Sequence, residues 1–214
     1  MIDKPYAAAC DRNRAPILAV LRDYFTDRRR VLEIGSGTGQ HAVFFAAQCP
    51  QWLWQTSDRP ENLPGIRAWL ADAALENTPP PLALDVFDPF PAGGFDALFS
   101  ANTLHIMPWP AVRRLFAALP SALADGAPIV IYGPFNYGGH FTSASNAAFD
   151  AQLKATAAHQ GIRDFEQVVE LAAAAGLAFL EDRAMPSNNR CLVWRKLAAG
   201  AIDHHQKGES NGWF

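Results

Sequence analysis

The feature that most constrains the fold of this chain is a glycine-rich segment, Glu33-Ile34-Gly35-Ser36-Gly37-Thr38-Gly39, between two unlike sequence patterns. A short apolar run at residues 31–34 precedes it and predicts a buried strand. Residues 38–49 follow with the pattern of a helix, which Pro50 ends. A strand, a tight glycine turn and a helix in this order present backbone amides at a helix N-terminus, where nucleotide-type ligands bind.

The same alternation continues along the chain. Further strands are predicted at residues 52–57, 82–85, 95–101 and 128–133, with helices at 66–76 and 112–123 and a kink or restart at Pro120. Repeated strand–helix units imply a parallel sheet that is buried on both faces. After a helix from Asp164 to Gly176, residues 177–183 and 191–196 read as a closing hairpin. We therefore predict an α/β fold with a mostly parallel seven-stranded sheet, its last strand antiparallel and helices on both faces.

Length and composition fit one domain. The 214 residues are 50% hydrophobic and 18% charged, so residues 1–197 can bury one large core, beginning with a helix at 13–26. Residues 198–214 lack apolar periodicity and are predicted to form a loose tail. The net charge of −3 argues against nucleic acid and membrane surfaces as partners. The N-terminus lacks the apolar run of a secretory signal, so we expect a cytoplasmic protein.

The glycine spacing separates several ligand classes. A dinucleotide fingerprint needs glycine or alanine at the position that Gln40 occupies here. A P-loop is excluded because no Gly-Lys-Ser/Thr sequence follows the glycines. The pattern is G-x-G-x-G with Glu33 two residues before its first glycine. A nicotinamide-dependent oxidoreductase is therefore the least favoured alternative.

Polar side chains follow the next three predicted strands. Asp58 ends the second strand, 19 residues past Gly39, where a carboxylate can accept hydrogen bonds from ribose hydroxyls. Asp85 ends the third strand and Asn102 follows the fourth. An acidic site of this kind suits a cationic nucleoside cofactor better than a pyrophosphate.

These residues resemble the first motifs of class I S-adenosylmethionine (SAM) methyltransferases. The resemblance implies a Rossmann-like fold, SAM as cofactor and S-adenosylhomocysteine as product. It implies cofactor contacts from Glu33, Gly35, Ser36, Gly37, Gly39, Asp58, Arg59, Asp85, Val86 and Asn102. Asn13 and Arg14 precede the first predicted apolar helix, which could fold over the carboxylate of the cofactor.

A closer resemblance covers about residues 11 to 196. Its motifs are Asp11-Arg12-Asn13-Arg14-Ala-Pro16-Ile17-Leu18, Ser57-Asp58-Arg59, Asn102-x-Leu-His105-Ile-x-Pro108-Trp109, Tyr132-Gly133-Pro134-Phe135, Phe141-Thr142-Ser143-x-Ser145-Asn146, Gly161-Ile-Arg163-Asp164 and Met185-Pro186-x-Asn188-Asn189. Together they are similar to the small family that includes methyltransferase-like protein 26. The first motif begins with Asp11 where that family has Glu. The resemblance implies a SAM-binding fold and supplies no methyl acceptor.

The acceptor is expected beside three polar loops at the carboxyl ends of the strands, residues 102–109, 134–146 and 185–189. The candidate substrate-pocket residues in these loops are Trp109, Phe135, Asn136, His140, Asn188 and Asn189. Glycines and aromatic residues at 136–141 have the composition of a lid that excludes water. We expect the acceptor to be a small molecule.

Methyl transfer needs a base only when the acceptor must lose a proton. His105 is the first candidate, because a neutral imidazole titrates near working pH. Tyr137 is a second, and Tyr132 and His140 are further alternatives. A packing role for His105 is the competing interpretation.

One further interpretation of the function is open. The chain could be a SAM-binding or S-adenosylhomocysteine-binding regulatory module without catalysis, since a fold does not establish an activity. A metal is not predicted, because His41, His159 and the pair His204-His205 have no ligand-spaced Asp, Glu or Cys nearby.

Overall fold

The apolar runs of the sequence form the strands of one central sheet. A computed structural model describes residues 4–91 and 94–198 of the chain. The sheet has the order β3-β2-β1-β4-β5-β9-β8. Its strands are β1 (Arg30–Ile34), β2 (Leu53–Asp58), β3 (Leu82–Ala83), β4 (Ala97–Ala101), β5 (Pro128–Gly133), β8 (Leu177–Met185) and β9 (Asn189–Lys196). The strands from β3 to β5 pair in parallel, and β9 is antiparallel to both neighbours. The predicted fold class, with the last strand reversed, is confirmed.

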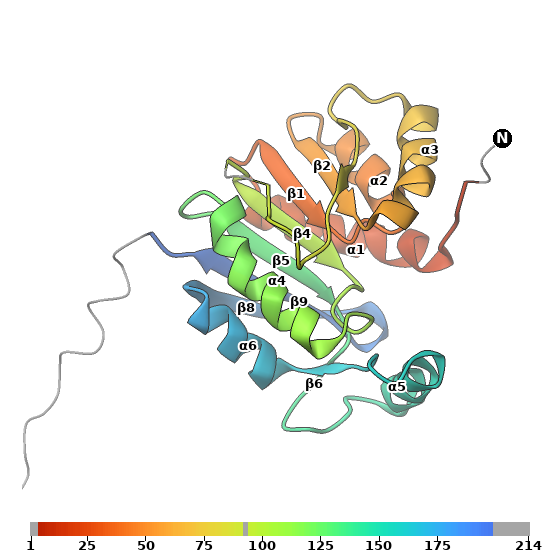
Figure 1. The fold of residues 1–214 in the computed structure, drawn as a ribbon, viewed down its shortest axis with the longest axis vertical. Coiled ribbons are helices and arrows are strands. Elements are labelled where there is room, and N and C mark those ends of the chain that lie inside the picture. Colours follow the sequence, from red (N-terminus) through yellow and green to blue (C-terminus); the bar gives the residue numbers. More distant parts are fainter. Residues whose placement is uncertain (1–3, 92–93, 199–214) are drawn as a thin grey trace, which may run out of the picture.

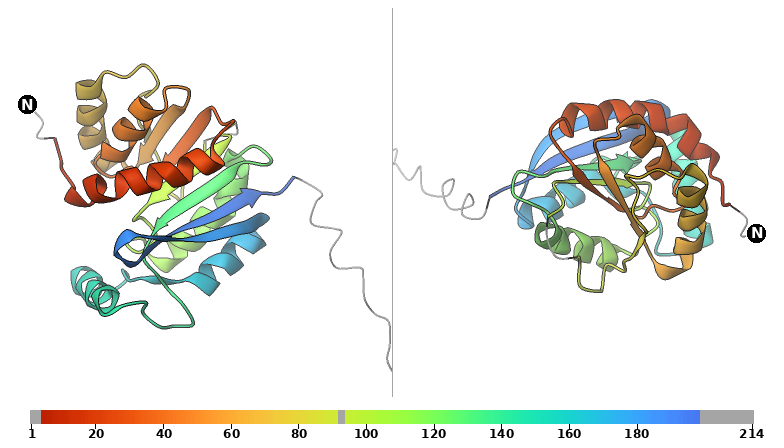
Figure 2. Two further views of the ribbon diagram at one scale, coloured as in Figure 1. Left: turned by 180° about the vertical axis from the view of Figure 1, so that it is seen from behind. Right: turned by 90° about the horizontal axis from the view of Figure 1, so that it is seen from above.

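Helices cover both faces of this sheet (Figures 1 and 2). One face carries α1 (Ala8–Tyr24), α2 (Gln40–Gln48) and α3 (Leu63–Ala73), and the other carries α4 (Trp109–Ala122) and α6 (Phe165–Ala174). Each face has its own apolar core, so the strands between them are apolar on both sides. This arrangement explains the low charged fraction of the sequence.

Aromatic side chains fill the core beneath α1 and α2. Phe45 of α2 packs 5.1 Å from the ring of Trp54 and 5.4 Å from that of Phe99, between ring centroids. Trp52 packs against Trp54 at 6.1 Å and places its indole N–H on the carbonyl of Phe25 at 3.2 Å. Burial of several large rings holds α1 and α2 firmly on the strands that carry the glycine-rich loop.

Several boundaries differ from the sequence predictions. Helix α1 begins at Ala8 instead of residue 13. Strand β3 has only two residues, because Asp85 turns the chain by accepting a hydrogen bond from the Phe87 amide at 3.0 Å. A kink or a restart was predicted at Pro120, and the restart is wrong: α4 continues through Pro120 and ends at Ala122.

The segment between β5 and β8 contains two short strands that periodicity did not reveal. Strands β6 (Phe135–Asn136) and β7 (Arg163–Asp164) pair in parallel as a separate two-stranded sheet. Helix α5 (Ala144–Thr156) connects them and lies apart from both helix layers, beyond β6 (Figure 1). Two short 3-10 helices, η1 (Pro60–Asn62) and η2 (Pro186–Asn188), follow β2 and β8. The predicted tail falls almost wholly on residues 199–214, outside the described residues.

Candidate functional site

The glycine-rich loop joins β1 to α2 at the carboxyl edge of the sheet. The amides of Gly35 and Ser36 both donate to the carbonyl of Ser57, at 3.0 and 3.1 Å. Gly35 has φ 70°, and a Cβ there would lie 2.6 Å from Oγ1 of Thr103. Only glycine fits this position, because both the backbone conformation and the space exclude a side chain. Gly39 permits close packing of α3, since a Cβ there would lie 3.2 Å from the Cα of Ile66.

Asp58 ends β2 and is hydrogen-bonded to this loop. One carboxylate oxygen accepts from the Gly37 amide at 2.7 Å. The other accepts from the Arg59 amide at 2.7 Å and from the Asn62 side chain at 2.8 Å. A carboxylate offers about four acceptor positions, so one position on Oδ2 remains for a ligand.

Glu33 lies beneath the loop, not in it. Its side chain is 1% exposed, and Oε2 accepts a hydrogen bond from the indole N–H of Trp54 at 3.0 Å. Burial raises the pKa of Glu33 to about 7, with the Asp58 carboxylate adding to the shift, while Trp54 and Ser36 oppose it. Glu33 therefore supports the loop from the core and does not line the cavity described below.

The ends of β3 and β4 bring further predicted residues to the same edge. Asp85, Val86 and Asn102 line one cavity together with the loop. Asn102 has φ 56° and donates its amide to the Tyr132 carbonyl at 2.8 Å. A non-glycine residue in the left-handed region carries local strain, which is common at binding sites. Phe87, 61% exposed, adds an apolar wall to this end of the cavity.

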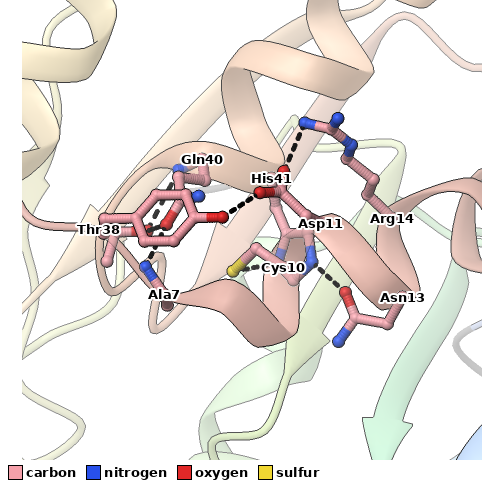
Figure 3. A network of polar contacts seen from close by, with 9 residues as sticks. Ala7, Cys10, Asp11, Asn13, Arg14, Thr38, Gln40 and His41 are labelled. Carbon is pink, nitrogen blue, oxygen red and sulfur yellow. Dashed lines mark hydrogen bonds and ion pairs between the residues drawn. The ribbon is translucent and has the colours of Figure 1, made fainter.

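The N-terminal helix is connected to the loop by a polar network (Figure 3). His41, at the start of α2, donates from Nε2 to the Asn13 side-chain oxygen at 2.7 Å, and its Nδ1 lies 3.9 Å from Sγ of Cys10. Burial lowers the pKa of His41 to about 4, and the Arg14 charge adds to the shift. His41 is therefore neutral at neutral pH. All three side chains, from Cys10, Asn13 and His41, line the cavity.

Gln40 has a structural role at the position where a dinucleotide site has a small residue. Its side-chain oxygen accepts from the Ala7 amide at 2.6 Å and from the Thr38 hydroxyl at 3.1 Å. These bonds attach the chain before α1 to the loop (Figure 3). The glutamine side chain thus holds the N-terminal segment beside the site.

Arg14 lies outside the cavity and Arg12 lies in its wall. Arg14 forms an ion pair with Asp11 at 2.7 Å and its guanidinium packs over the Phe44 ring at 4.7 Å. Arg12, two residues earlier on α1, is exposed and lines the cavity. The sequence motif contained both arginines, and only the helix orientation distinguishes them.

His105 faces the other end of the cavity. Its side chain is 6% exposed, and its ring packs edge-on against Phe149 of α5 at 5.3 Å between centroids. Burial lowers the pKa of His105 to about 4, and the Arg163 charge adds to the shift. The imidazole is therefore neutral at neutral pH and can accept a proton, but its pKa lies below the working pH near which we expected it to titrate.

Arg163 of β7 holds the loop that carries His105. Its guanidinium donates to the carbonyls of Leu104 at 3.0 Å, Met107 and His159 at 3.0 Å. These bonds connect the β4–α4 loop to the segment after α5. Both flanks of His105 are consequently fixed by one side chain.

The loop at 186–189 also reaches the site. Pro186, Ser187 and Asn189 line the cavity, together with Asn146. Asn146 donates its side-chain amide to the carbonyl of Asn188 at 3.2 Å, so α5 and this loop are joined. Asn188 contributes its backbone to this junction and its side chain does not line the cavity.

Besides Gly39, which packs against α3, five other predicted site residues do not line the cavity. Tyr137 donates its hydroxyl to Asp182 at 2.6 Å, and burial, this hydrogen bond and the Asp182 charge all raise its pKa. His140 bridges back to Tyr137 in an exposed turn. The remaining three are Trp109, which lies under the Arg163 guanidinium, Phe135, which is buried in the core, and Asn136, whose side-chain oxygen is buried.

These walls enclose one continuous cavity of about 1100 Å³ at the carboxyl edge of the sheet. Many of its lining residues were not predicted as site residues from the sequence, among them Cys10, Arg12, His41, Asn62, Phe149 and Gln160. Arg12 lies within one predicted motif and Asn62 lies three residues after another, so position in the sequence was the available signal. Phe149 and Gln160 reach the site only through the placement of α5.

Neither a metal centre nor a membrane span is evident in the part of the chain that the structure describes. Residues 4–91 and 94–198 contain no group of three or more His, Cys, Asp or Glu side chains that could hold a metal ion. Within the same residues, no helix is long and apolar enough to cross a membrane.

The fold matches the class I methyltransferase fold. A SAM-dependent methyltransferase, SibL, aligns with a TM-score of 0.75 and 25% identity over 89% of this chain. An O-methyltransferase family protein from Burkholderia thailandensis aligns with a TM-score of 0.76 and 18% identity over 86% of the chain. An O-methyltransferase family 2 protein from Planctomyces limnophilus, in complex with apigenin, aligns with a TM-score of 0.76 and 20% identity over 86%. This chain spans 56% of each of those proteins.

The family itself is defined by sequence. A model described as "Protein of unknown function (DUF938)" matches residues 4–196. The chain belongs to this DUF938 family.

Proposed function

We propose that this chain is a SAM-dependent methyltransferase that acts on a small-molecule acceptor. The observation that carries the proposal is one cavity that runs from the glycine-rich loop and Asp58 at one end to His105 at the other. A cavity volume of about 1100 Å³ lies at the upper end of the range of about 300–1,000 Å³ typical of ligand sites, so it leaves room for two ligands. We further propose a cytoplasmic protein, related to the family that includes methyltransferase-like protein 26.

The residues at the loop end fit SAM. Gly37 lines the cavity, and a Cβ there would meet no protein atom within 4 Å, so the absence of a side chain lets a ligand approach the loop backbone closely. The free position on Asp58 Oδ2 suits a ribose hydroxyl, and the Asn62 amide beside it offers a second polar contact. Asp85 and Val86 are proposed to hold the adenine, with Phe87 as its apolar wall.

The main contribution of the protein to methyl transfer is to position the two reactants. SAM, when bound, supplies a methyl group already activated by its sulfonium. Ile106, Phe149 and Pro134 line the acceptor end with apolar surface, which excludes water from the acceptor. Asn146 and Asn189 offer amide groups there that can orient a polar acceptor. Holding two reactants in line is a large part of the rate enhancement for such a reaction.

His105 is the proposed base for a hydroxyl acceptor. Its imidazole is neutral at neutral pH, so a ring nitrogen is free to take the hydroxyl proton as the new carbon–oxygen bond forms. The O-methyltransferases among the structural neighbours support oxygen as the accepting atom. The proton then resides on His105 until solvent removes it.

The test is methyl transfer from radiolabelled SAM into a small-molecule extract by wild type and His105→Asn. We expect S-adenosylhomocysteine affinity to be unchanged and turnover to fall about 10²–10⁴-fold, because the base is lost and the cofactor site is intact. Glu76→Ala, an exposed carboxylate after α3, serves as the surface control. Equal turnover by His105→Asn and wild type would make His105 a packing residue.

One observation favours a second candidate, a SAM- or S-adenosylhomocysteine-binding module without catalysis. The imidazole of His105 has no hydrogen-bonded partner among the described residues, so no carboxylate orients it as in many acid–base sites. This candidate predicts tight binding of both nucleotides and no labelled product in any extract. The same radiolabel experiment therefore distinguishes the two candidates.

A further inference from the structure

Four fully charged side chains line the cavity, and three of them have partners. Asp58 accepts hydrogen bonds from the loop, Asp85 accepts one from the Phe87 amide, and Arg59 forms an ion pair with Glu61. Arg12 is the fourth, and it has no ion pair or side-chain hydrogen bond with any residue in 4–91 or 94–198. The cavity thus contains one cation whose charge is not matched by its described surroundings.

The nearest carboxylate in sequence does not neutralise this cation. Asp11 is occupied by the Arg14 guanidinium at 2.7 Å and by the Tyr6 hydroxyl (Figure 3). The two acidic side chains in the cavity wall come from elsewhere: Asp58 ends β2, and Asp85 lies in the segment after β3. Arg12 comes instead from α1, beside Asn13 and near Tyr132; burial raises the pKa of Tyr132, and the Arg12 charge opposes that rise in part.

A guanidinium in a cavity wall is suited to a planar anion. Its fork of N–H groups binds a carboxylate through two parallel hydrogen bonds, which a lysine cannot reproduce. The exposed side chain of Arg12 needs little desolvation to reach such a ligand. The polar groups at the acceptor end of the cavity, from Asn146, Asn189 and His105, are uncharged at neutral pH.

We propose that Arg12 is the anion-binding residue of this cavity and that it binds a carboxylate. The proposal rests on the proposed function for the identity of the ligands. Two ligands could supply the carboxylate: the methionine end of the cofactor, or a methyl acceptor that carries a carboxylate of its own. In the second case the acceptor class is narrowed to hydroxy-carboxylates.

The test uses calorimetry on the full chain with matched variants. Arg12→Met removes the charge, Arg12→Lys keeps the charge without the fork, and Arg22→Met removes an equal charge from an exposed site near the other end of α1. The ligands are S-adenosylhomocysteine and 5′-methylthioadenosine, which lacks the amino-acid end. Benzoate and benzamide are then titrated into the protein with and without S-adenosylhomocysteine. Circular dichroism confirms that each variant is folded.

Either of two results supports the proposal. A loss of tenfold or more in S-adenosylhomocysteine affinity for Arg12→Met, with 5′-methylthioadenosine unaffected, assigns Arg12 to the cofactor carboxylate. Unchanged nucleotide affinity with loss of benzoate binding, and not of benzamide binding, assigns it to the acceptor. In both cases Arg12→Lys is intermediate and Arg22→Met matches wild type.

The proposal is overturned if Arg12→Met matches wild type with every ligand. Failure of wild type to bind S-adenosylhomocysteine contradicts the proposed function, not this inference. In that event the benzoate titration without nucleotide tests the assignment of Arg12 by itself. The assignment is overturned if wild type does not bind benzoate, or if Arg12→Met binds benzoate as tightly as wild type does.

Discussion

Asp58 connects the glycine-rich loop to the proposed ribose site. Asp58→Ala removes the acceptor of the Gly37 amide and the remaining free carboxylate position together. We expect S-adenosylhomocysteine binding to weaken by about 1–3 kcal/mol, since a ribose hydroxyl and a loop amide lose their partner. Calorimetry on Asp58→Ala and on the surface control Glu76→Ala measures this. Equal affinity in both variants would remove Asp58 from the cofactor site.

Glu33 predicts a pH dependence of stability. Its folded pKa of about 7 lies above the ordinary value of 4.5, so folding favours the protonated carboxyl. Its contribution to stability is therefore fully present below about pH 4.5 and is lost as pH rises through about 7. Glu33→Gln should abolish this loss, gaining about 3 kcal/mol relative to wild type between pH 4.5 and pH 8. Urea unfolding at several pH values measures it, and parallel curves would contradict the assignment.

Several single residues were predictable from sequence because their role depends on backbone position. Gly35, Asp58 and Asn102 directly follow or end strands, so a correct strand assignment places them at the carboxyl edge. Arg12 and Arg14 show the limit of that reasoning. Positions two residues apart on a helix point in different directions, and only the packing of α1 decides which guanidinium lines the cavity.

At the scale of elements, the turn between β1 and α2 depends on the absence of a side chain at Gly35. Gly35→Ala would place a Cβ 2.6 Å from Thr103 Oγ1 in addition to the strain of a positive φ. Gly126→Ala is the matched control, because its φ is 77° and nothing lies within 4 Å of a Cβ there. We expect Gly35→Ala to cost about 1–3 kcal/mol more than Gly126→Ala in unfolding free energy. Equal losses of unfolding free energy in the two variants would mean that the Thr103 side chain moves aside without an energetic penalty.

Arg163 joins three segments that the sequence keeps apart. Arg163→Ala leaves the carbonyls of Leu104, Met107 and His159 without this donor. We expect a loss of about 2–3 kcal/mol in unfolding free energy, because the bonds involve a charged donor that is half-buried. Thermal unfolding measures the loss against Arg22→Ala, whose single backbone contact at 3.4 Å should cost under about 0.5 kcal/mol. A similar loss in both variants would show that the three hydrogen bonds of Arg163 contribute no stability.

The elements most poorly predicted are β6 and β7, the two short strands between β5 and β8. Strands β6 and β7 have two residues each, which is too short for any hydrophobic period. Tyr137 and His140 have the composition of a lid, yet Tyr137 is bonded to Asp182 and the turn after it to Glu166. Composition cannot show where such a turn is anchored, because the anchoring residues are distant in sequence.

At the scale of the whole molecule, alternating periodicity was sufficient for the fold class and strand direction. A parallel sheet with a closing antiparallel hairpin follows from the order of elements alone. The acceptor end of the cavity was less predictable, since it combines α1, α5 and the loop after β8. We propose that residues 1–197 form one unit, as both apolar cores share the same sheet.

The central claim is that the cavity holds SAM, and direct binding tests it. Isothermal titration of the wild-type chain with SAM, S-adenosylhomocysteine and NAD compares the sulfur nucleotides with the dinucleotide that Gln40 disfavours. We expect saturable one-site binding of both sulfur nucleotides and no binding of NAD. Absence of binding by SAM and S-adenosylhomocysteine would contradict it.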